Sequence, residues 1–300
     1  MTRLFARVAL VAASAALALG LGACSGPDVS QSATTTPPAP EQTSTSPSAE
    51  PTATDISQLT FTPGKLTIAT GNPAYSPWVE NDAPESGEGF EAAVSYAVAE
   101  ELGFAKADVV WVRTTFDEAI TPGPKEWDLN IQQFSITDER KQAVDFSASY
   151  YTTAQAVLTY EGSPLAGATT IAELKEGSIG AMVGTTSLTA AEQQIAPTKP
   201  VSIFNTNADL VQELKSKQVE AIVVDLPTAL YLAAVEIEGG TIIGQLADTT
   251  GGDQFGFVLP KGSALTEPIS AAIEGLASDG VLADLEQKWL SESISVPVLS

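Results

Sequence analysis

The chain has 300 residues, of which 44% are hydrophobic and 17% charged, a composition typical of one large or two ordinary globular domains. Its 37 acidic residues outnumber 14 basic ones, and the net charge of −23 repels phosphate backbones, which argues against a nucleic-acid partner. It has no histidine and one cysteine, so the commonest metal ligand and general base is absent and no intrachain disulfide can form. We therefore expect no catalytic residue, no cofactor and no metal site.

Residues 1–23 read as a secretory signal peptide. Arg3 and Arg7 precede an uncharged apolar run over residues 8–21, which is shorter than the roughly 20 apolar residues of a membrane span. The run ends in Leu21-Gly-Ala-Cys24, which resembles the lipobox of bacterial lipoproteins. The resemblance implies acylation of Cys24 and a lipid-anchored place on the extracytoplasmic face of the cell membrane. An ordinary signal peptide with a chance cysteine remains the alternative.

Residues 24–61 are predicted to form a disordered tether. Ser, Thr, Pro, Ala and Gln dominate this stretch, which offers too little apolar area to offset the entropy of ordering it. A flexible coil of this length spans roughly 30–35 Å, so a folded domain could stand off a membrane and remain near a membrane partner. An O-glycosylated stalk is compatible with the same composition.

From residue 62 onward, predicted strands alternate with predicted helices, which indicates an α/β fold with a largely parallel sheet. The strands are expected over residues 65–70, 109–112, 129–132, 178–182, 219–224, 241–246 and 255–259. The helices are expected over residues 89–102, from residue 170, over 186–194, over 208–217 with Asn207 as cap, over 226–235, and twice more from near Ser263 and Asp279.

Four polar or aromatic turns follow these strands. They are Asn72–Trp78, Gln132–Arg140, Gly184–Ser187 and the strand-end Asp225. Because ligands in such sheets bind beyond the carboxyl ends of the strands, these four turns could converge on one crevice.

An ordered set of motifs carries a family resemblance. The set comprises Asn72-Pro-Ala-Tyr-Ser-Pro-Trp78, Gly89-Phe-Glu, the run from Trp127 to Arg140 with Ser-Ile-Thr at its centre, Val144-Asp-Phe-Ser147 with Tyr150-Tyr151, Gly184-Thr-Thr, Asp225, and the final segment from Ala283 to Trp289. Over residues 65–290 the chain resembles the amino-acid-binding, family-3 solute-binding proteins of ABC transporters.

The resemblance implies a two-lobed, periplasmic-binding-protein-like (type II) clamshell with two hinge strands. Lobe I would take residues 62–153 and 255–300, and lobe II residues 154–254. The protein would be a monomer and no enzyme, and it would carry an amino-acid-like ligand to ABC permease subunits in the membrane.

The candidate ligand-binding residues suit a zwitterion. A guanidinium binds a carboxylate bidentately, a helix N-terminus with hydroxyls favours an anion, and an ionised carboxylate accepts from an ammonium. The assigned residues are Arg140, Thr185 and Thr186 for the ligand carboxylate, Asp225 for its ammonium, Ser135 and Gln133 for the polar cage, and Tyr75 and Trp78 as aromatic faces.

Structural alternatives stay open for these residues. Arg140 could pair with Asp145 or Glu139 on the surface, Tyr75 and Trp78 could be core residues, and Thr185, Thr186 and Asp225 could only cap helices.

The sequence departs from the family pattern at several positions, so the ligand stays open. Ala93 stands where a second Asp is common, and residues 121–125 replace a helical segment. Gln132 and Gln133 stand where small residues are usual and favour a polar neutral ligand side chain, whereas the acidic residues between 80 and 88 favour a basic one.

Two other functions also remain. One is a sensory lipoprotein that signals to a membrane partner. The other is a cyclohexadienyl dehydratase-like enzyme with Glu80 or Asp82 as its acid or base.

Overall fold

The computed structural model describes residues 55–247, 252–290 and 296–300, so the predicted signal peptide, Cys24 and most of the predicted tether lie outside the described residues. Residues 55–61 are described, and they pack on the first lobe. Ile56, in the short 3₁₀ helix Ile56–Gln58, contacts the core, and the backbone N–H of Phe61 donates to Asp128 Oδ1 at 2.6 Å. The folded part thus begins before residue 62, because the Ile56 side chain packs against the core of lobe I.

The first sheet has the strand order β2-β1-β3-β10-β4. Its strands are β1 (Leu66–Gly71), β2 (Val109–Thr114), β3 (Leu129–Asn130), β4 (Asp145–Thr153) and β10 (Asp253–Leu259). β1 pairs in parallel with β2 and β3, whereas β10 runs antiparallel to β3 and β4. We call this sheet and its helices lobe I.

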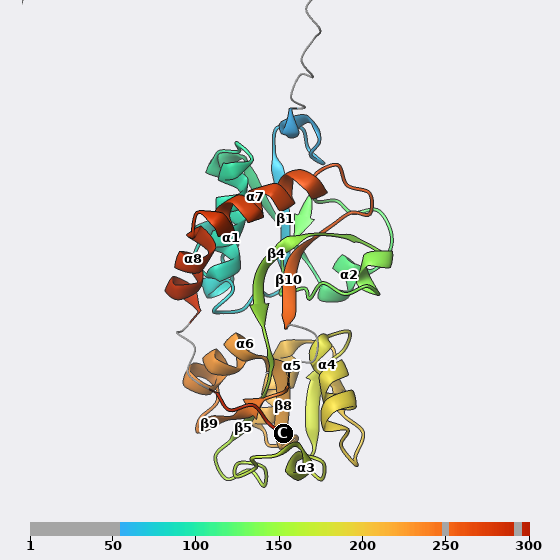
Figure 1. The fold of residues 1–300 in the computed structure, drawn as a ribbon, viewed down its shortest axis with the longest axis vertical. Helices are drawn as coiled ribbons and strands as arrows, with labels where there is room; N and C mark the ends of the chain where they lie inside the picture. Colours follow the sequence, from blue (N-terminus) through green and yellow to red (C-terminus); the bar gives the residue numbers. More distant parts are fainter. Residues whose placement is uncertain (1–54, 248–251, 291–295) are drawn as a thin grey trace, which may run out of the picture. The chain divides into compact units, whose positions relative to one another are not determined.

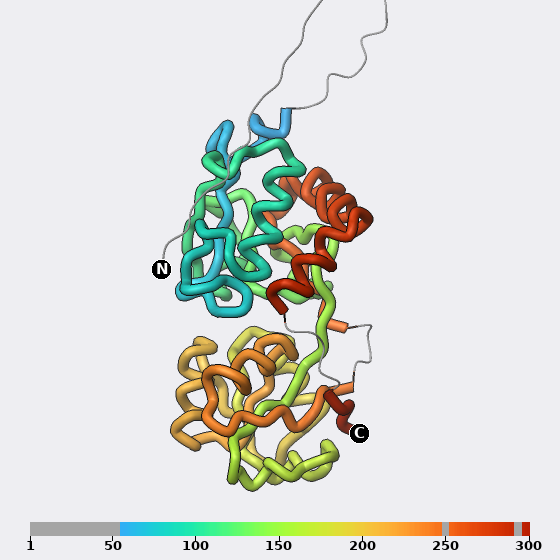
Figure 2. Tube along the Cα trace, turned by 90° about the vertical axis from the view of Figure 1, so that its left-hand side faces the viewer, coloured from blue at the N-terminus to red at the C-terminus, as the bar shows by residue number. Residues whose placement is uncertain are grey.

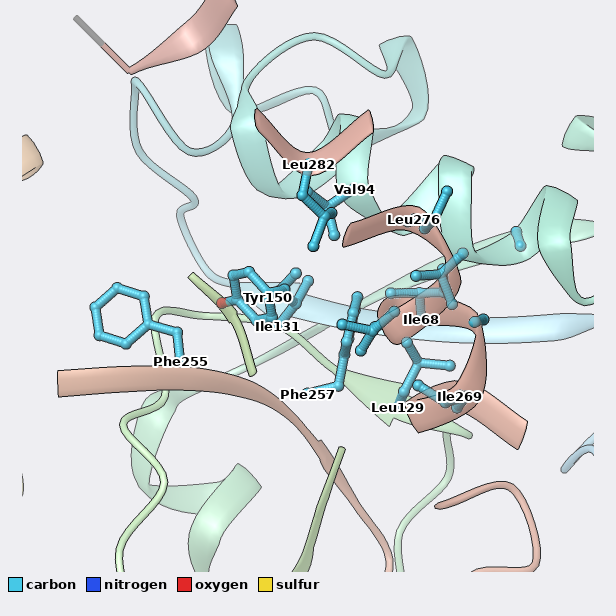
Figure 3. Packing of buried hydrophobic residues seen from close by; sticks show 14 of the residues in the cluster. Ile68, Val94, Leu129, Ile131, Tyr150, Phe255, Phe257, Ile269, Leu276 and Leu282 are labelled. Carbon is cyan, nitrogen blue, oxygen red and sulfur yellow. The ribbon is translucent and has the colours of Figure 1, made fainter. Parts of the chain in front are cut away.

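Helices cover both faces of the lobe I sheet. On one face lie α1 (Phe90–Glu101), α7 (Thr266–Ser278) and α8 (Val281–Trp289), and α2 (Phe116–Ile120) lies on the other (Figure 1). Phe90, Val94 and Val98 recur every four residues along α1 and are fully buried, as helical periodicity requires. Figure 3 shows Val94 of α1 and Leu282 of α8 side by side in the core that also contains Ile68 and Leu129.

Gly89 fixes the start of α1 against the loop after β1. Its φ is +99°, a conformation that L side chains rarely adopt, and a Cβ there would lie 2.5 Å from the carbonyl oxygen of Trp78. The glycine therefore lets the aromatic loop pack directly on the helix N-terminus.

The second sheet has the order β7-β6-β8-β5-β9, and with its helices it forms lobe II. Its strands are β5 (Gln155–Tyr160), β6 (Ile179–Met182), β7 (Ser202–Phe204), β8 (Ala221–Asp225) and β9 (Gly240–Gln245). Its helices are α3 (Ile171–Leu174), α4 (Thr186–Ala190), α5 (Asn207–Lys215) and α6 (Leu226–Tyr231), and α4 and α6 continue as π-helical turns over Ala191–Ile195 and Leu232–Glu236.

The lobes are joined by chain crossings. β4 leads through Ala154 into β5, visible as the green segment that runs from one sheet to the other in Figure 2, and the chain comes back from β9 to β10. The α/β two-lobed fold is confirmed, but the prediction of largely parallel sheets is wrong. β6 pairs in parallel with β7 and β8, whereas β5 runs antiparallel to β8 and β9. The crossing strands β5 and β10 run against their neighbours because they carry the chain into and out of lobe II.

The last residues belong to lobe II, which corrects the expectation that residues 255–300 return wholly to lobe I. Val298 forms a parallel bridge with Gln245 at the edge of β9, and the Leu299 side chain is buried, with 1% exposed. Gly244 makes this possible, since a Cβ at that position would lie 2.6 Å from Leu299 Cγ.

A few local expectations also differ. α5 is capped by the Thr206 hydroxyl, which accepts from the backbone N–H of Asp209 at 3.1 Å, and not by Asn207. The predicted strand over 129–132 is paired only at Leu129 and Asn130, while α2 and β7 were not predicted. Within the described residues, no helix has the length and apolar character needed to cross a membrane.

Candidate functional site

The turns after β1, β3, β6 and β8 line two adjoining cavities between the lobes. One, of about 40 Å³, is lined by Arg140 and Ser135 from lobe I and by Thr186 and Asp225 from lobe II. The other, of about 310 Å³, lies beside the loop that follows β1. The two cavities share the lining residues Phe116, Gln132, Gln133, Met182 and Asn207. They can therefore receive two ends of one small molecule.

Arg140 begins a 3₁₀ turn after β3 and contacts both lobes. Its side chain is buried, with 9% of the residue exposed. Nη1 donates to the Ser135 carbonyl at 2.7 Å and Nη2 to the Gly184 carbonyl of lobe II at 2.9 Å. Asp145, which was considered as a surface partner of Arg140, instead pairs with Lys261 at 3.0 Å. Arg140 thus lies in the site and not on the surface.

The charge of Arg140 is balanced by acids that do not touch it. Burial lowers the pKa of the guanidinium, while the negative charges of Asp253 and Asp225 raise it. Phe116 lies below the guanidinium, 5.3 Å from its carbon to the ring centroid. Two of the five N–H donors are used by the carbonyls, so the group keeps donors for an anion.

Asp225 ends β8 and makes no capping hydrogen bond to α6, so capping is not its role. Its Oδ1 accepts from Gln155 Nε2 at 2.8 Å. The same amide nitrogen donates to Asp253 Oδ2. Burial, followed by the nearby charge of Asp253, raises the pKa of Asp225 to about 7. Two carboxyl groups therefore share one amide, which a cation could replace.

Thr185 and Thr186 have different roles. The Thr185 hydroxyl caps α4 by accepting from the Leu188 N–H at 3.1 Å and donates to the Met182 carbonyl at 2.7 Å, so its bonding capacity is largely used. Thr186 Oγ1 lies 3.1 Å from Ser135 Oγ across the cleft, and it donates to Asp253 Oδ2 at 3.1 Å. Thr186 therefore joins the lobes, whereas Thr185 acts as a helix cap.

The two predicted aromatic faces also separate. Trp78 is 2% exposed and packs edge-to-face on Phe90, Tyr151 and Phe255, with ring centroids 5.8–6.1 Å apart. Its Nε1 donates to Thr228 Oγ1 of lobe II at 3.0 Å. Tyr75 is 36% exposed and lines the larger cavity. Trp78 is thus a core residue at the cavity wall, and Tyr75 is the accessible ring.

Gln133 lies between the two cavities in a left-handed conformation with φ of +51°. Its backbone N–H donates to Glu91 Oε1 at 2.7 Å, and its side-chain nitrogen donates to Glu91 Oε2. Tyr150 Oη also donates to Glu91 Oε1. Burial raises the pKa of Glu91 to about 7, against the lowering effect of these three donors. The Glu of the Gly89-Phe-Glu motif therefore holds the ligand loop in place.

Sequence reasoning missed Phe116, Gln155 and Asp253. Phe116 had a usable signal, because it follows Thr115 in a capping box directly after β2. Gln155 and Asp253 lie on the crossing strands β5 and β10, and only the mixed sheet topology brings them beside Asp225.

The two acids considered as catalytic groups have structural partners. Glu80 Oε2 accepts from Ser76 Oγ at 2.8 Å. Asp82 pairs with Arg113 at 2.6 Å and accepts from the Ala74 N–H at 2.9 Å. Both therefore hold the loop that carries Tyr75. Across the part of the chain that the structure describes, no cluster of acidic or cysteine side chains could hold a metal ion.

Comparisons with known proteins agree with this architecture. The profile of a family described as bacterial extracellular solute-binding proteins, family 3, matches residues 66–292. The L-arginine-binding protein of Pseudomonas aeruginosa is 29% identical over 226 residues, which cover 73% of this chain and 85% of that protein. The ABC transporter glutamine-binding protein of Bacillus subtilis is 29% identical over 70% of this chain and 76% of its own.

A solved structure shares the fold. An ancestral arginine-binding protein bound to glutamine is 30% identical and superposes with a TM-score of 0.64 over 76% of this chain and 99% of its own. These three proteins are all named for the binding of an amino acid and not for an enzymatic activity. The chain therefore belongs to the bacterial extracellular solute-binding proteins of family 3.

Proposed function

We propose that this protein is the lipid-anchored receptor of an ABC importer, and that it binds an amino acid between its lobes and delivers it to the permease. One observation carries the proposal: a guanidinium from lobe I and a carboxyl group from lobe II, Arg140 and Asp225, line the same small cavity. No side chain positioned for a chemical reaction on the ligand is needed.

The ligand carboxylate would bind the free donors of Arg140 together with the hydroxyls of Ser135 and Thr186. Charge-assisted hydrogen bonds of this kind are about twice as strong as neutral ones, and a guanidinium can make two in parallel. The Arg140 contacts to Ser135 and Gly184 hold the guanidinium in place from both lobes.

The ligand ammonium would bind Asp225 and take the place of the Gln155 amide. The nearby Asp253 adds negative charge, which stabilises a cation there. Since each end of the ligand contacts both lobes, binding shifts the hinge equilibrium toward the closed form. The closed form is then the one that the permease recognises.

A screen of the common amino acids tests the proposal. Ligand binding raises the melting temperature by mass action, and titration calorimetry of the hits gives their affinities. Arg140→Ala should weaken the binding of the ligand by about 2–5 kcal/mol, because a buried carboxylate loses its partner. Lys141→Ala removes an exposed cation next to it and should leave the affinity unchanged. An unaltered affinity in Arg140→Ala would remove that residue from the site.

The anchor has a separate test. Cys24→Ser should release the protein from the membrane fraction into the medium, because no acyl chain can be attached to it. Its retention in the membrane fraction would contradict the lipoprotein assignment.

The transport role is distinguished from sensing by the partner. The loaded protein should stimulate ATP hydrolysis by the permease complex in proteoliposomes, and the Arg140→Ala protein should not. Stimulation of a membrane kinase instead would favour the sensory function.

A further inference from the structure

The larger cavity has a polar lining that is rich in carboxamides. Five carboxamides line it: Asn72, Gln132, Gln133, Asn205 and Asn207. No Lys or Arg does so among the residues that the structure describes. Since this cavity adjoins the one at Arg140, it offers room for the side chain of a bound amino acid.

Gln132 is held in one orientation. It is 8% exposed, and its Nε2 donates to Thr114 Oγ1 at 3.0 Å and to Asn130 Oδ1 at 2.8 Å. Asn130 Nδ2 also donates to Thr114 Oγ1 at 2.8 Å. Both amide protons of Gln132 are therefore used inside lobe I, and the rest of the group can act only as an acceptor.

The acceptor of Gln132 faces Gly71 at the cavity wall. A Cβ on Gly71 would lie 3.3 Å from Oε1, so the glycine leaves this oxygen room. None of the hydrogen bonds within the described part of the chain ends on this oxygen. The oxygen is therefore an oriented acceptor that remains free to accept from the N–H of a ligand in the cavity.

The carboxylates of this cavity do not serve a cation well. Glu91 already accepts from Tyr150 and twice from Gln133. Asp117 is exposed at the rim. A buried cation beside amide oxygens alone would lose its hydration without a counter-charge. An acidic side chain would meet an acceptor and no cation.

We propose that the ligand is an amino acid whose side chain ends in a neutral carboxamide, of the glutamine class, with its N–H donating to Gln132 Oε1. This inference rests on the proposed function, because it assumes that Arg140 and Asp225 hold the two ends of an amino acid. Phe116 and Tyr75 supply the apolar walls for the methylene groups of that side chain.

Calorimetry with L-glutamine, L-glutamate, L-arginine and L-norleucine tests the inference on the purified protein. Glutamine should bind at least about 10-fold more tightly than the other three, since a site built around a hydrogen-bonding group rejects analogues that leave it unpaired. The difference in affinity between glutamine and norleucine measures the contribution of the side-chain amide. The affinities for arginine and glutamate measure the effect of a positive and of a negative charge on the side chain.

A substitution then probes the acceptor. Gln132→Glu keeps an oxygen there and adds a negative charge, so the ratio of arginine affinity to glutamine affinity should rise by about 10-fold or more. Gln58→Glu makes the same change on the exposed N-terminal turn and should not alter the ratio. Melting curves of both variants exclude loss of folding as the cause.

The outcomes separate the inference from the function. If no amino acid binds, the proposed function fails. If arginine or glutamate binds the unaltered protein more tightly than glutamine does, or if Gln132→Glu folds and leaves the ratio unchanged, the carboxamide inference is overturned while amino-acid binding stands.

Discussion

The two lobes are built from different kinds of side chain. The buried Phe and Trp residues of the described chain all lie in lobe I, among them Trp78, Phe90 and Phe255, whereas the two clusters of lobe II consist mainly of Val, Leu, Ile and Ala. Rings packed edge-to-face are worth about 0.5–1.5 kcal/mol per pair beyond their buried area, and they have few rotamers. In lobe I the packed rings thus form a rigid support for the ligand loop. Lobe II has an aliphatic core, and its site residues lie at the ends of two strands.

The lobes also divide the charges of the site. Lobe I holds Arg140, lobe II holds Asp225, and the crossing strands hold Gln155 and Asp253. Direct side-chain contacts across the cleft include Trp78 to Thr228, Ser135 to Thr186 and Arg140 to Gly184. Neither lobe can complete the site, so ligand affinity and lobe closure are tied together.

The largest effect should follow from breaking the aromatic packing of lobe I. Phe255→Ala should lower the free energy of unfolding by about 3–5 kcal/mol, because it opens a cavity between Trp78, Tyr150 and Tyr151. Urea denaturation followed by tryptophan fluorescence measures the change. Phe61→Ala removes the same ring from a site that is 55% exposed and should cost little. A loss below about 1 kcal/mol for Phe255→Ala would contradict the view of these rings as a rigid support.

The pH dependence of stability should depend on Asp225. Its folded-state pKa of about 7 lies above the usual value of 3.8, so the stability it contributes is full below about pH 4 and is lost as the pH rises through 7. Asp225→Asn removes this loss. Between pH 4 and pH 8, in the absence of ligand, the free energy of unfolding of the variant should rise relative to that of the unaltered protein by at most about 4 kcal/mol. Denaturation at several pH values measures it.

Several charges face Asp225 and shape this titration. Asp253 and Glu91 raise its pKa, and Arg140 and the Gln155 amide lower it. Asp138→Asn alters a side chain that is fully exposed and should leave the pH profile as it is. A profile of Asp225→Asn that runs parallel to that of the unaltered protein would show that Asp225 titrates normally.

The aliphatic packing of lobe II should be easier to disturb locally. Leu299→Ala should lower the free energy of unfolding by about 2–3 kcal/mol. This is at the low end for a buried leucine, because the residue lies next to the chain end. Hydrogen exchange should quicken in β9 and stay unchanged in β1. Val298→Ala, at an exposed neighbouring position, is the control. Equal acceleration in both lobes would mean that they unfold as one unit.

The smallest effect concerns a contact across the cleft. Thr186→Val removes the hydroxyl that bonds Ser135 and Asp253, and it should lower the free energy of unfolding by about 0.5–1.5 kcal/mol. Thr189→Val on the exposed side of α4 provides the matched change. No difference between the two variants would show that the cleft contact adds nothing to stability.

The sequence predicted those parts of the molecule that depend on local pattern. Strand and helix periodicity predicted β1, α1, β6 and β8, and the turns after β1, β3, β6 and β8 carry most of the site residues. The site residues that were missed depend on long-range topology: Gln155 and Asp253 are 98 residues apart and meet only because β5 and β10 are the crossing strands. The core position of Trp78 was equally hidden, because the same loop motif suits a ring that packs inward and a ring that faces a ligand.

The placement of the chain terminus has a practical consequence. Leu290 is buried in lobe I and Leu299 in lobe II, so two positions nine residues apart in sequence move with different bodies. A fluorophore introduced on the outer side of α8 and another joined after Ser300 would therefore report hinge motion directly. A bulky fusion at the same end would instead disturb the edge of β9, where Val298 is paired with Gln245.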